Sequence, residues 1–163
     1  MGHFDELHAV KFMGQLDLDN SSLKGISKFT ATASISAADS GKTFLVGPAA
    51  AGLAADAVAT LPSAAEGLYY RFIYVGNAAD AADLQLNTGS DTNFFLGGLA
   101  HYDTDTDDSD GIPDAVFGDG NSNSKVNILT PSAGTVVECY CDGTNWFLWG
   151  DVVSASAPTF ADQ

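Results

Sequence analysis

The chain has 163 residues, 45% of them hydrophobic, which fits one globular domain of ordinary size and excludes a disordered chain. Its 21 acidic residues outnumber 6 basic ones, and the net charge of −15 argues against direct binding to nucleic acid or to an anionic membrane. The charge favours a cationic partner, such as a metal ion or a basic protein surface. No secretory signal and no membrane-spanning apolar run is visible, so we expect the protein to be made and folded in the cytoplasm.

The first segment, Met1–Lys28, is the least regular part of the sequence. Gly14 and Gly25 interrupt any long helix within it, and its polar patches have the character of turns. We interpret it as an irregular N-terminal arm that precedes one folded domain, residues 29–163.

Beyond the arm, short apolar or alternating segments are separated by turns rich in Gly, Asp, Asn, Ser and Pro. Alternation of apolar and polar residues with β-branched and aromatic side chains is typical of strands, and we find no convincing helical periodicity. The sequence therefore predicts an all-β fold, an antiparallel β-sandwich or jelly-roll-like domain of eight to ten strands. The expected strands are 28–36, 43–47, 57–62, 67–76, 82–88, 93–98, 125–130, 135–143 and 144–153.

The strand expected at 144–153 carries large apolar side chains on both of its faces. A period of two places Trp146 and Leu148 on one face and Phe147 and Trp149 on the other. Such a strand is either central in a sandwich or covered by a neighbouring subunit. The tail that follows, residues 154–163, is small and polar, and we expect it to be exposed.

Two cysteines, Cys139 and Cys141, are separated by a single residue. On a strand their Cα atoms would be roughly 6.5–7 Å apart, at the limit for a disulfide, and a metal site needs more ligands at wider spacing. We interpret both as small buried hydrophobic residues. Arg71, the only arginine, lies inside an apolar strand, where we expect an acidic neighbour to pair with it.

The most distinctive local pattern is the acidic stretch Asp103–Asp119. Calcium takes six to eight oxygen ligands in flexible geometry, and carboxylates at alternate positions supply them. The pattern resembles the calcium loops of thrombospondin type 3 and dockerin-like repeats, although no Glu closes it as in an EF-hand. Calcium is one interpretation, and a solvated acidic loop without metal is the other. The expected calcium ligands are Asp103, Asp105, Asp107, Asp110 and Asp114.

Support for catalysis is weak, and we expect no enzymatic activity. His101 and Ser109 flank acidic residues, but proximity in sequence alone does not make a catalytic triad. Gly41-Lys42-Thr43 lacks the upstream glycine of a phosphate-binding loop and leads into a strand. The aromatic residues of the strands suit either a carbohydrate groove or, more simply, the core and a subunit interface.

Several segments together resemble structural proteins of tailed bacteriophages, of the head decoration (cement) type. Thr60-Leu61-Pro62 ends a predicted strand, Gly67–Phe72 follows, and Gly134–Gly150 closes the pattern, so the resemblance covers about 34–150. It implies a β-sandwich that forms a homo-oligomer, a trimer in our expectation, in the virion, bound to the major capsid protein on the outer surface of the capsid. The same pattern occurs in tail-fibre or appendage modules, so a receptor- or glycan-binding module is the alternative.

Overall fold

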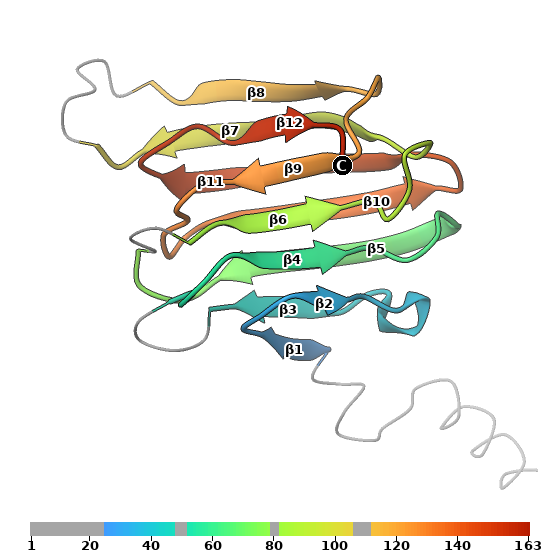
Figure 1. Ribbon diagram of the computed structural model, residues 1–163, viewed down its shortest axis with the longest axis horizontal. Helices are drawn as coiled ribbons and strands as arrows, with labels where there is room; N and C mark the ends of the chain where they lie inside the picture. Colours follow the sequence, from blue (N-terminus) through green and yellow to red (C-terminus); the bar gives the residue numbers. More distant parts are fainter. Residues whose placement is uncertain (1–24, 48–51, 79–81, 106–111) are drawn as a thin grey trace, which may run out of the picture.

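The computed structural model describes residues 25–47, 52–78, 82–105 and 112–163, which form two β-sheets packed face to face (Figure 1). The only helical element in these residues is a short 3₁₀ turn, η1 (Ala37–Asp39). The all-β sandwich expected from the sequence is therefore confirmed. No helix among the described residues is both long enough and apolar enough to span a membrane.

Sheet A has seven strands and sheet B has five. In spatial order, sheet A consists of β1 (Ile26–Phe29), β3 (Thr43–Val46), β5 (Glu66–Tyr74), β10 (Val136–Asp142), β11 (Trp146–Ser154), β7 (Phe95–Asp103) and β8 (Asp114–Asp119). Sheet B consists of β12 (Thr159–Ala161), β9 (Lys125–Ile128), β6 (Leu84–Asn87), β4 (Ala57–Thr60) and β2 (Ala33–Ser34).

The sheets are mixed rather than antiparallel throughout. From β1 to β7 the chain alternates between the sheets, with odd-numbered strands in sheet A and even-numbered strands in sheet B. When the chain leaves one sheet, forms a strand in the other sheet and returns, the new strand begins at the same end of the first sheet as the previous strand there. It therefore runs parallel to the strand two places earlier in the chain. The pairs β1–β3, β3–β5, β2–β4 and β4–β6 are parallel for this reason. The pair β7–β11 is parallel because β10 runs antiparallel to β5 and the hairpin from β10 to β11 reverses the direction again. Parallel neighbours distinguish the arrangement from a jelly roll, which is antiparallel.

The observed strands differ from the expected ones in several places, and three of these differences change the strand count. The single strand expected at 28–36 is divided into β1 and β2, which belong to different sheets, and β1 begins within the last residues of the expected arm. Strand β8 lies within the stretch interpreted as an acidic loop, and β12 lies within the tail interpreted as exposed. The described strands consequently number twelve instead of eight to ten.

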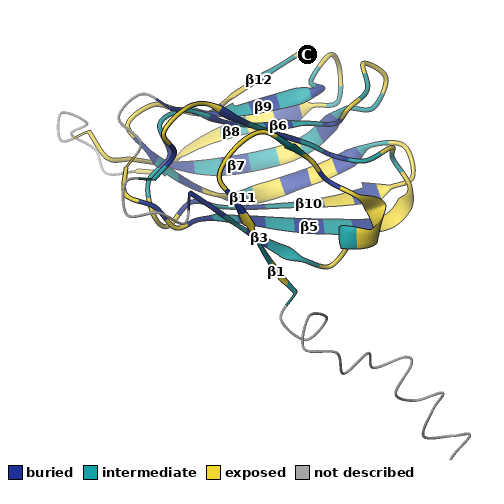
Figure 2. Ribbon diagram, turned by 60° about the horizontal axis from the view of Figure 1, so that its bottom comes forward, coloured by how far each residue is buried: buried dark blue, intermediate teal, exposed yellow. Residues whose placement is uncertain are grey.

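The core fills the space between the sheets, and buried residues alternate with exposed ones along β5, β10 and β11 (Figure 2). The largest fully buried side chains come from both sheets: Trp146, Tyr70, Tyr74, Phe72 and Phe95 from sheet A, with Leu84, Leu86 and Ile128 from sheet B. Sheet A contributes the aromatic rings together with aliphatic residues such as Leu99 and Leu148, and sheet B contributes aliphatic side chains.

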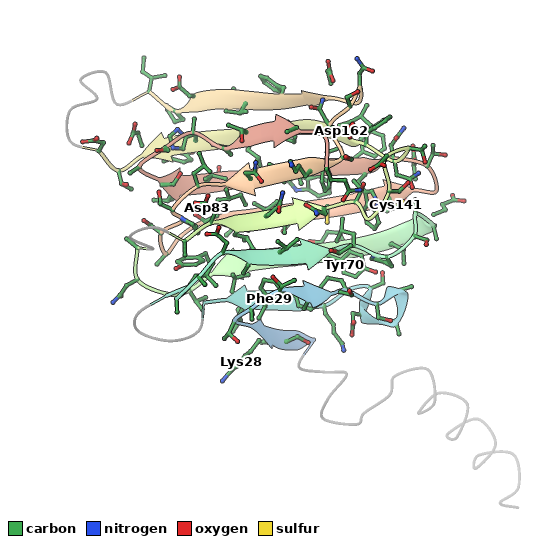
Figure 3. The ribbon with its side chains drawn as sticks, in the orientation of Figure 1. Lys28, Phe29, Tyr70, Asp83, Cys141 and Asp162 are labelled. Atoms are coloured by element: carbon green, nitrogen blue, oxygen red, sulfur yellow. The ribbon has the colours of Figure 1, made fainter. Side chains whose placement is uncertain are left out.

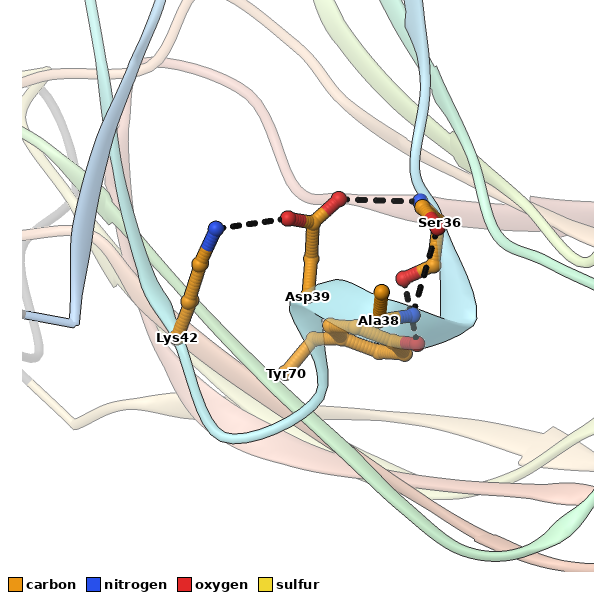
Figure 4. A network of polar contacts seen from close by, with 5 residues as sticks. All are labelled: Ser36, Ala38, Asp39, Lys42 and Tyr70. Atoms are coloured by element: carbon orange, nitrogen blue, oxygen red, sulfur yellow. Dashed lines mark hydrogen bonds and ion pairs between the residues drawn. The ribbon is translucent and has the colours of Figure 1, made fainter. Parts of the chain in front are cut away.

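A polar network caps the core where η1 crosses it (Figure 4). Tyr70 donates its hydroxyl to the carbonyl of Ser36 at 3.0 Å, and Ser36 Oγ in turn accepts from the N–H of Ala38. Asp39 Oδ2 accepts from the N–H of Ser36, while Lys42 Nζ lies 2.7 Å from Asp39 Oδ1. The bond from Lys42 lowers the pKa of Asp39, and burial raises the pKa of Tyr70 to about 12.

The C-terminus is held on sheet B. Strand β12 pairs with β9, and Asp162, labelled in Figure 3 near the end of the chain, accepts a hydrogen bond from Ser124 Oγ at 2.6 Å. Ser124 is fully buried and also accepts from the N–H of Gln163 at 2.9 Å. Phe160 of β12 lies against Gly118 of β8, so the last strand connects one edge of sheet B with sheet A.

Candidate interaction surface

The outer face of sheet A carries a group of aromatic side chains that none of the described residues covers with a further layer. We call it the aromatic face: the outward residues of β5, β10, β11, β7 and β8, including Tyr69, Tyr102, Phe117, Tyr140, Phe147 and Trp149. The most accessible of these is Phe117, 69% exposed, while Trp149 and Phe147 are 43% and 40% exposed. Large rings so accessible at the centre of a sheet are unusual unless a partner covers them.

The strand register sets the aromatic residues in adjoining rows. In the first row, Tyr140 has Tyr69 on one side and Phe147 on the other, and Leu96 follows Phe147. Since neighbouring strands lie about 4.8 Å apart, these side chains are in direct reach of one another. The first row is therefore continuous across β5, β10, β11 and β7.

The second row contains an ion pair between central strands of this face. Arg71 of β5 lies beside Glu138 of β10, which in turn lies beside Trp149 of β11. Arg71 Nε is 3.1 Å from Glu138 Oε1, within ion-pair distance but without hydrogen-bond geometry. Trp149 donates its indole N–H to Glu138 Oε2 at 2.9 Å. The acidic partner expected for Arg71 is thus Glu138, and the same carboxylate fixes the orientation of the exposed indole.

The Glu138 carboxylate also acts on Tyr69. Partial burial is the first cause of the raised pKa of the Tyr69 phenol, and the nearby Glu138 carboxylate is the second. Glu138 therefore interacts with side chains from both neighbouring strands. Because its charge is balanced by Arg71, the second row carries no net charge, while Asp151 of β11 places an exposed carboxylate in the next row of the same face.

Gly98 makes room for the ring of Phe117 at the β8 end of the second row. In the register, Gly98 of β7 lies between Trp149 and Phe117. A Cβ atom on Gly98 would lie 2.5 Å from Phe117 Cδ1, a distance that no real contact allows. The aromatic surface therefore continues to the edge of sheet A.

The outer face of sheet B has a different character. Its register places Gln85 beside Asn127, with Thr159 next, and Asn87 beside Lys125. These side chains are polar and partly exposed, as expected for a face in water. The sandwich is thus asymmetric, with one hydrated face and one aromatic face.

Of the residues expected to bind calcium, the structure describes Asp103, Asp105 and Asp114, which lie at the end of β7, just after it and at the start of β8. Asp103 is the last residue of β7, and Asp114 is the first residue of β8. Asp114 pairs with His101, which lies two residues before Asp103. The N–H of Asp105 donates to Asp103 Oδ1 at 2.7 Å, a local bond of the kind that aspartate side chains make in turns. The other two expected ligands, Asp107 and Asp110, lie outside the described residues. Among described residues no three His, Cys, Asp or Glu form a group suited to a metal, so calcium binding stays a prediction.

The remaining candidates of the sequence are placed in the core or outside the described residues. Cys139 and Cys141 are both free and fully buried, which confirms their interpretation as small core residues, and burial raises the pKa of the Cys139 thiol. His101 is buried with Nε2 3.1 Å from the carbonyl oxygen of Ser154. Ser109, the other residue considered for a triad, lies outside the described residues.

The structure divides the aromatic residues that the sequence suggested as one cluster. Tyr70, Phe72, Tyr74, Phe95 and Trp146 are in the core, whereas Tyr69, Phe147 and Trp149 are on the aromatic face. Phe117 was missed as a surface residue because β8 was read as part of an acidic loop. The short apolar run Ala115–Phe117 between Asp114 and Asp119 was the available signal.

Comparisons with protein-family models, with curated protein sequences and with solved structures found no match to this chain.

Proposed function

We propose that this protein is a capsid decoration (cement) protein of a tailed bacteriophage, a non-enzymatic module that binds the major capsid protein on the outer surface of the head. The observation that carries the proposal is the asymmetry of the sandwich. Its aromatic face exposes large apolar rings of the kind that partners cover, while the outer face of sheet B carries polar side chains suited to water.

Binding of this kind needs no chemistry beyond burial of surface. A protein that attaches only to the assembled shell adds contacts that the dissociated state lacks, and it stabilises the shell by mass action. The net charge of −15 is compatible with a position outside the shell, because it repels the packaged DNA. In this proposal the protein is a homo-oligomer, a trimer that matches the threefold sites of a capsid.

The arm Met1–Lys28 is the proposed tether to the shell. It contains apolar residues such as Phe4, Leu7 and Val10, and its last residues enter sheet A through β1. An extended chain spans about 3.3 Å per residue, so an arm of this length is able to reach a neighbouring protein tens of ångströms away.

The test is binding to purified heads that lack the protein, measured by cosedimentation. The intact chain is expected to bind the heads to saturation and to raise the temperature at which they disrupt. A variant without residues 1–24, which keeps β1, is expected to unfold like the intact chain in urea but to bind heads much more weakly. Absence of binding by the intact chain contradicts the proposal, and full occupancy by the truncated chain removes the arm as the tether.

The alternative function, a tail-appendage module that binds a receptor glycan, draws on one specific observation. Trp149 is half exposed and held in place by Glu138, and an oriented ring next to a charged pair suits the apolar face and the hydroxyl groups of a sugar. Quenching or a shift of Trp149 fluorescence by host surface polysaccharide, lost in Trp149→Ala, would favour this alternative. An unchanged spectrum would leave decoration as the function.

A further inference from the structure

We infer that the aromatic face is covered by a second copy of the same chain, so that the protein associates with itself through sheet A. The inference rests on the proposed function, which supplies the expectation of an oligomer, and it adds the surface through which the copies meet. Three features of the described residues support it: the area of the face, its charge and the contrast with sheet B.

The area of the aromatic face is sufficient for an interface between subunits. Its five most exposed rings, Tyr102, Phe117, Tyr140, Phe147 and Trp149, are 39–69% exposed. An aromatic side chain offers roughly 150–250 Å², so these five present about 350–600 Å². Partly exposed neighbours such as Leu96 and Ile73 extend this area toward the about 800 Å² per partner that a stable interface buries.

The charge of the face identifies another copy of this chain as the occupant. Two molecules of charge −15 repel each other, so they associate only through surfaces with little net charge. Arg71 and Glu138 neutralise one another at the centre of the aromatic face. One cation beside one anion is also complementary to a copy of itself, since a two-fold axis sets Glu138 of each molecule against Arg71 of the other. This contact joins two copies, and the threefold contacts of the proposed trimer would use other surfaces.

A cationic partner is less compatible with this surface. Such a partner would be attracted to carboxylates; on the aromatic face Arg71 neutralises Glu138, and the register adds only a small part of the total charge of −15, including the carboxylates of Asp151 on β11 and of Asp119 at the β8 edge. Self-association and binding of a cationic partner also respond to salt in opposite directions. Salt screens the repulsion between acidic copies and strengthens their association, whereas it weakens attraction between opposite charges.

The test is sedimentation equilibrium of the purified full chain alone, without heads. From about 0.1 M to about 1 M sodium chloride the screening length falls from about 10 Å to about 3 Å, and we expect association to strengthen. Phe117→Asp replaces a ring that is 69% exposed with a charged carboxylate. It is expected to weaken association by more than about tenfold without unfolding the domain. Gln85→Glu adds the same charge on the outer face of sheet B and is expected to leave association unchanged.

A second variant protects the result from effects on folding. Phe147→Asp changes the centre of the face and is expected to act in the same direction as Phe117→Asp, with urea unfolding measured for each protein. A monomeric wild-type chain at high protein concentration, or equal weakening by Gln85→Glu, overturns the inference. Because heads are absent, failure here leaves binding to the capsid to be judged by its own experiment, and failure to bind heads leaves self-association intact.

Discussion

Truncation of Trp149 to alanine is the most informative single change on the aromatic face. The indole is 43% exposed, and with about 250 Å² for a tryptophan this corresponds to about 110 Å² available to a partner. At about 25 cal/mol per Å², covering that area contributes about 2.7 kcal/mol to association. Trp149→Ala is therefore expected to raise the dissociation constant of the oligomer about 100-fold.

The control variant is Trp149→Phe, which keeps an aromatic ring but removes the N–H that Glu138 Oε2 accepts. We expect it to weaken association less than about tenfold, because most of the apolar area is retained. Dissociation constants from sedimentation equilibrium are compared with urea unfolding followed through Trp146, which is fully buried in the core. If Trp149→Ala associates as tightly as the wild type while its fold is intact, the aromatic face is not the interface and the reasoning is refuted.

Three further predictions concern the stability of the domain and calcium binding by the acidic stretch Asp103–Asp119. The pKa of Tyr70 is raised to about 12, so the phenol stays neutral in the fold, and about 2–3 kcal/mol of stability is expected to be lost as pH rises from about 10 to about 12. Urea unfolding of Tyr70→Phe is measured at neutral pH and across the same alkaline range. The variant is expected to be about 1 kcal/mol less stable at neutral pH, because it lacks the hydrogen bond to Ser36, and to lose less stability than the wild type as the pH rises. Deletion of residues 159–163 removes β12 and the Ser124–Asp162 bond, and it is expected to lower the free energy of unfolding by about 2–4 kcal/mol; an unchanged urea midpoint would show that β12 contributes nothing. Calcium at about millimolar concentration is expected to raise the melting temperature, and a chelator to reverse this, whereas no heat of binding in calorimetry would leave a plain acidic loop.

The period-two alternation of the sequence was sufficient to predict which side chains of β11 share a face. Trp146 and Leu148 are together in the core, and Phe147 and Trp149 are together on the surface, but two apolar faces gave no means to predict which one is buried. Alternation contains no information on strand direction, because parallel and antiparallel strands share the same period. The parallel pairs arise from a chain that alternates between two sheets, and contacts between residues far apart in sequence decide that path.

The candidate surface was predictable only in part, for a similar reason. An acidic partner was expected for Arg71, but its identity as Glu138 depends on the register between β5 and β10. Strand β8 was hidden because its terminal aspartates match the acidic stretch around them, and only pairing with β7 makes them part of a strand. Strand β12 is three residues long, too short for alternation to indicate a strand, and its pairing with β9 is a tertiary contact.

The most direct test of the proposed function is a density map of purified virus particles that contain this protein, at a resolution that separates strands. We expect the sandwich on the outside of the head, with the aromatic face of sheet A against another copy of the chain and the polar face of sheet B toward solvent. A sandwich found only on the tail, or absent from the particle, would contradict the proposed function. A sandwich on the head with Phe147 and Trp149 open to solvent would contradict the inferred interface.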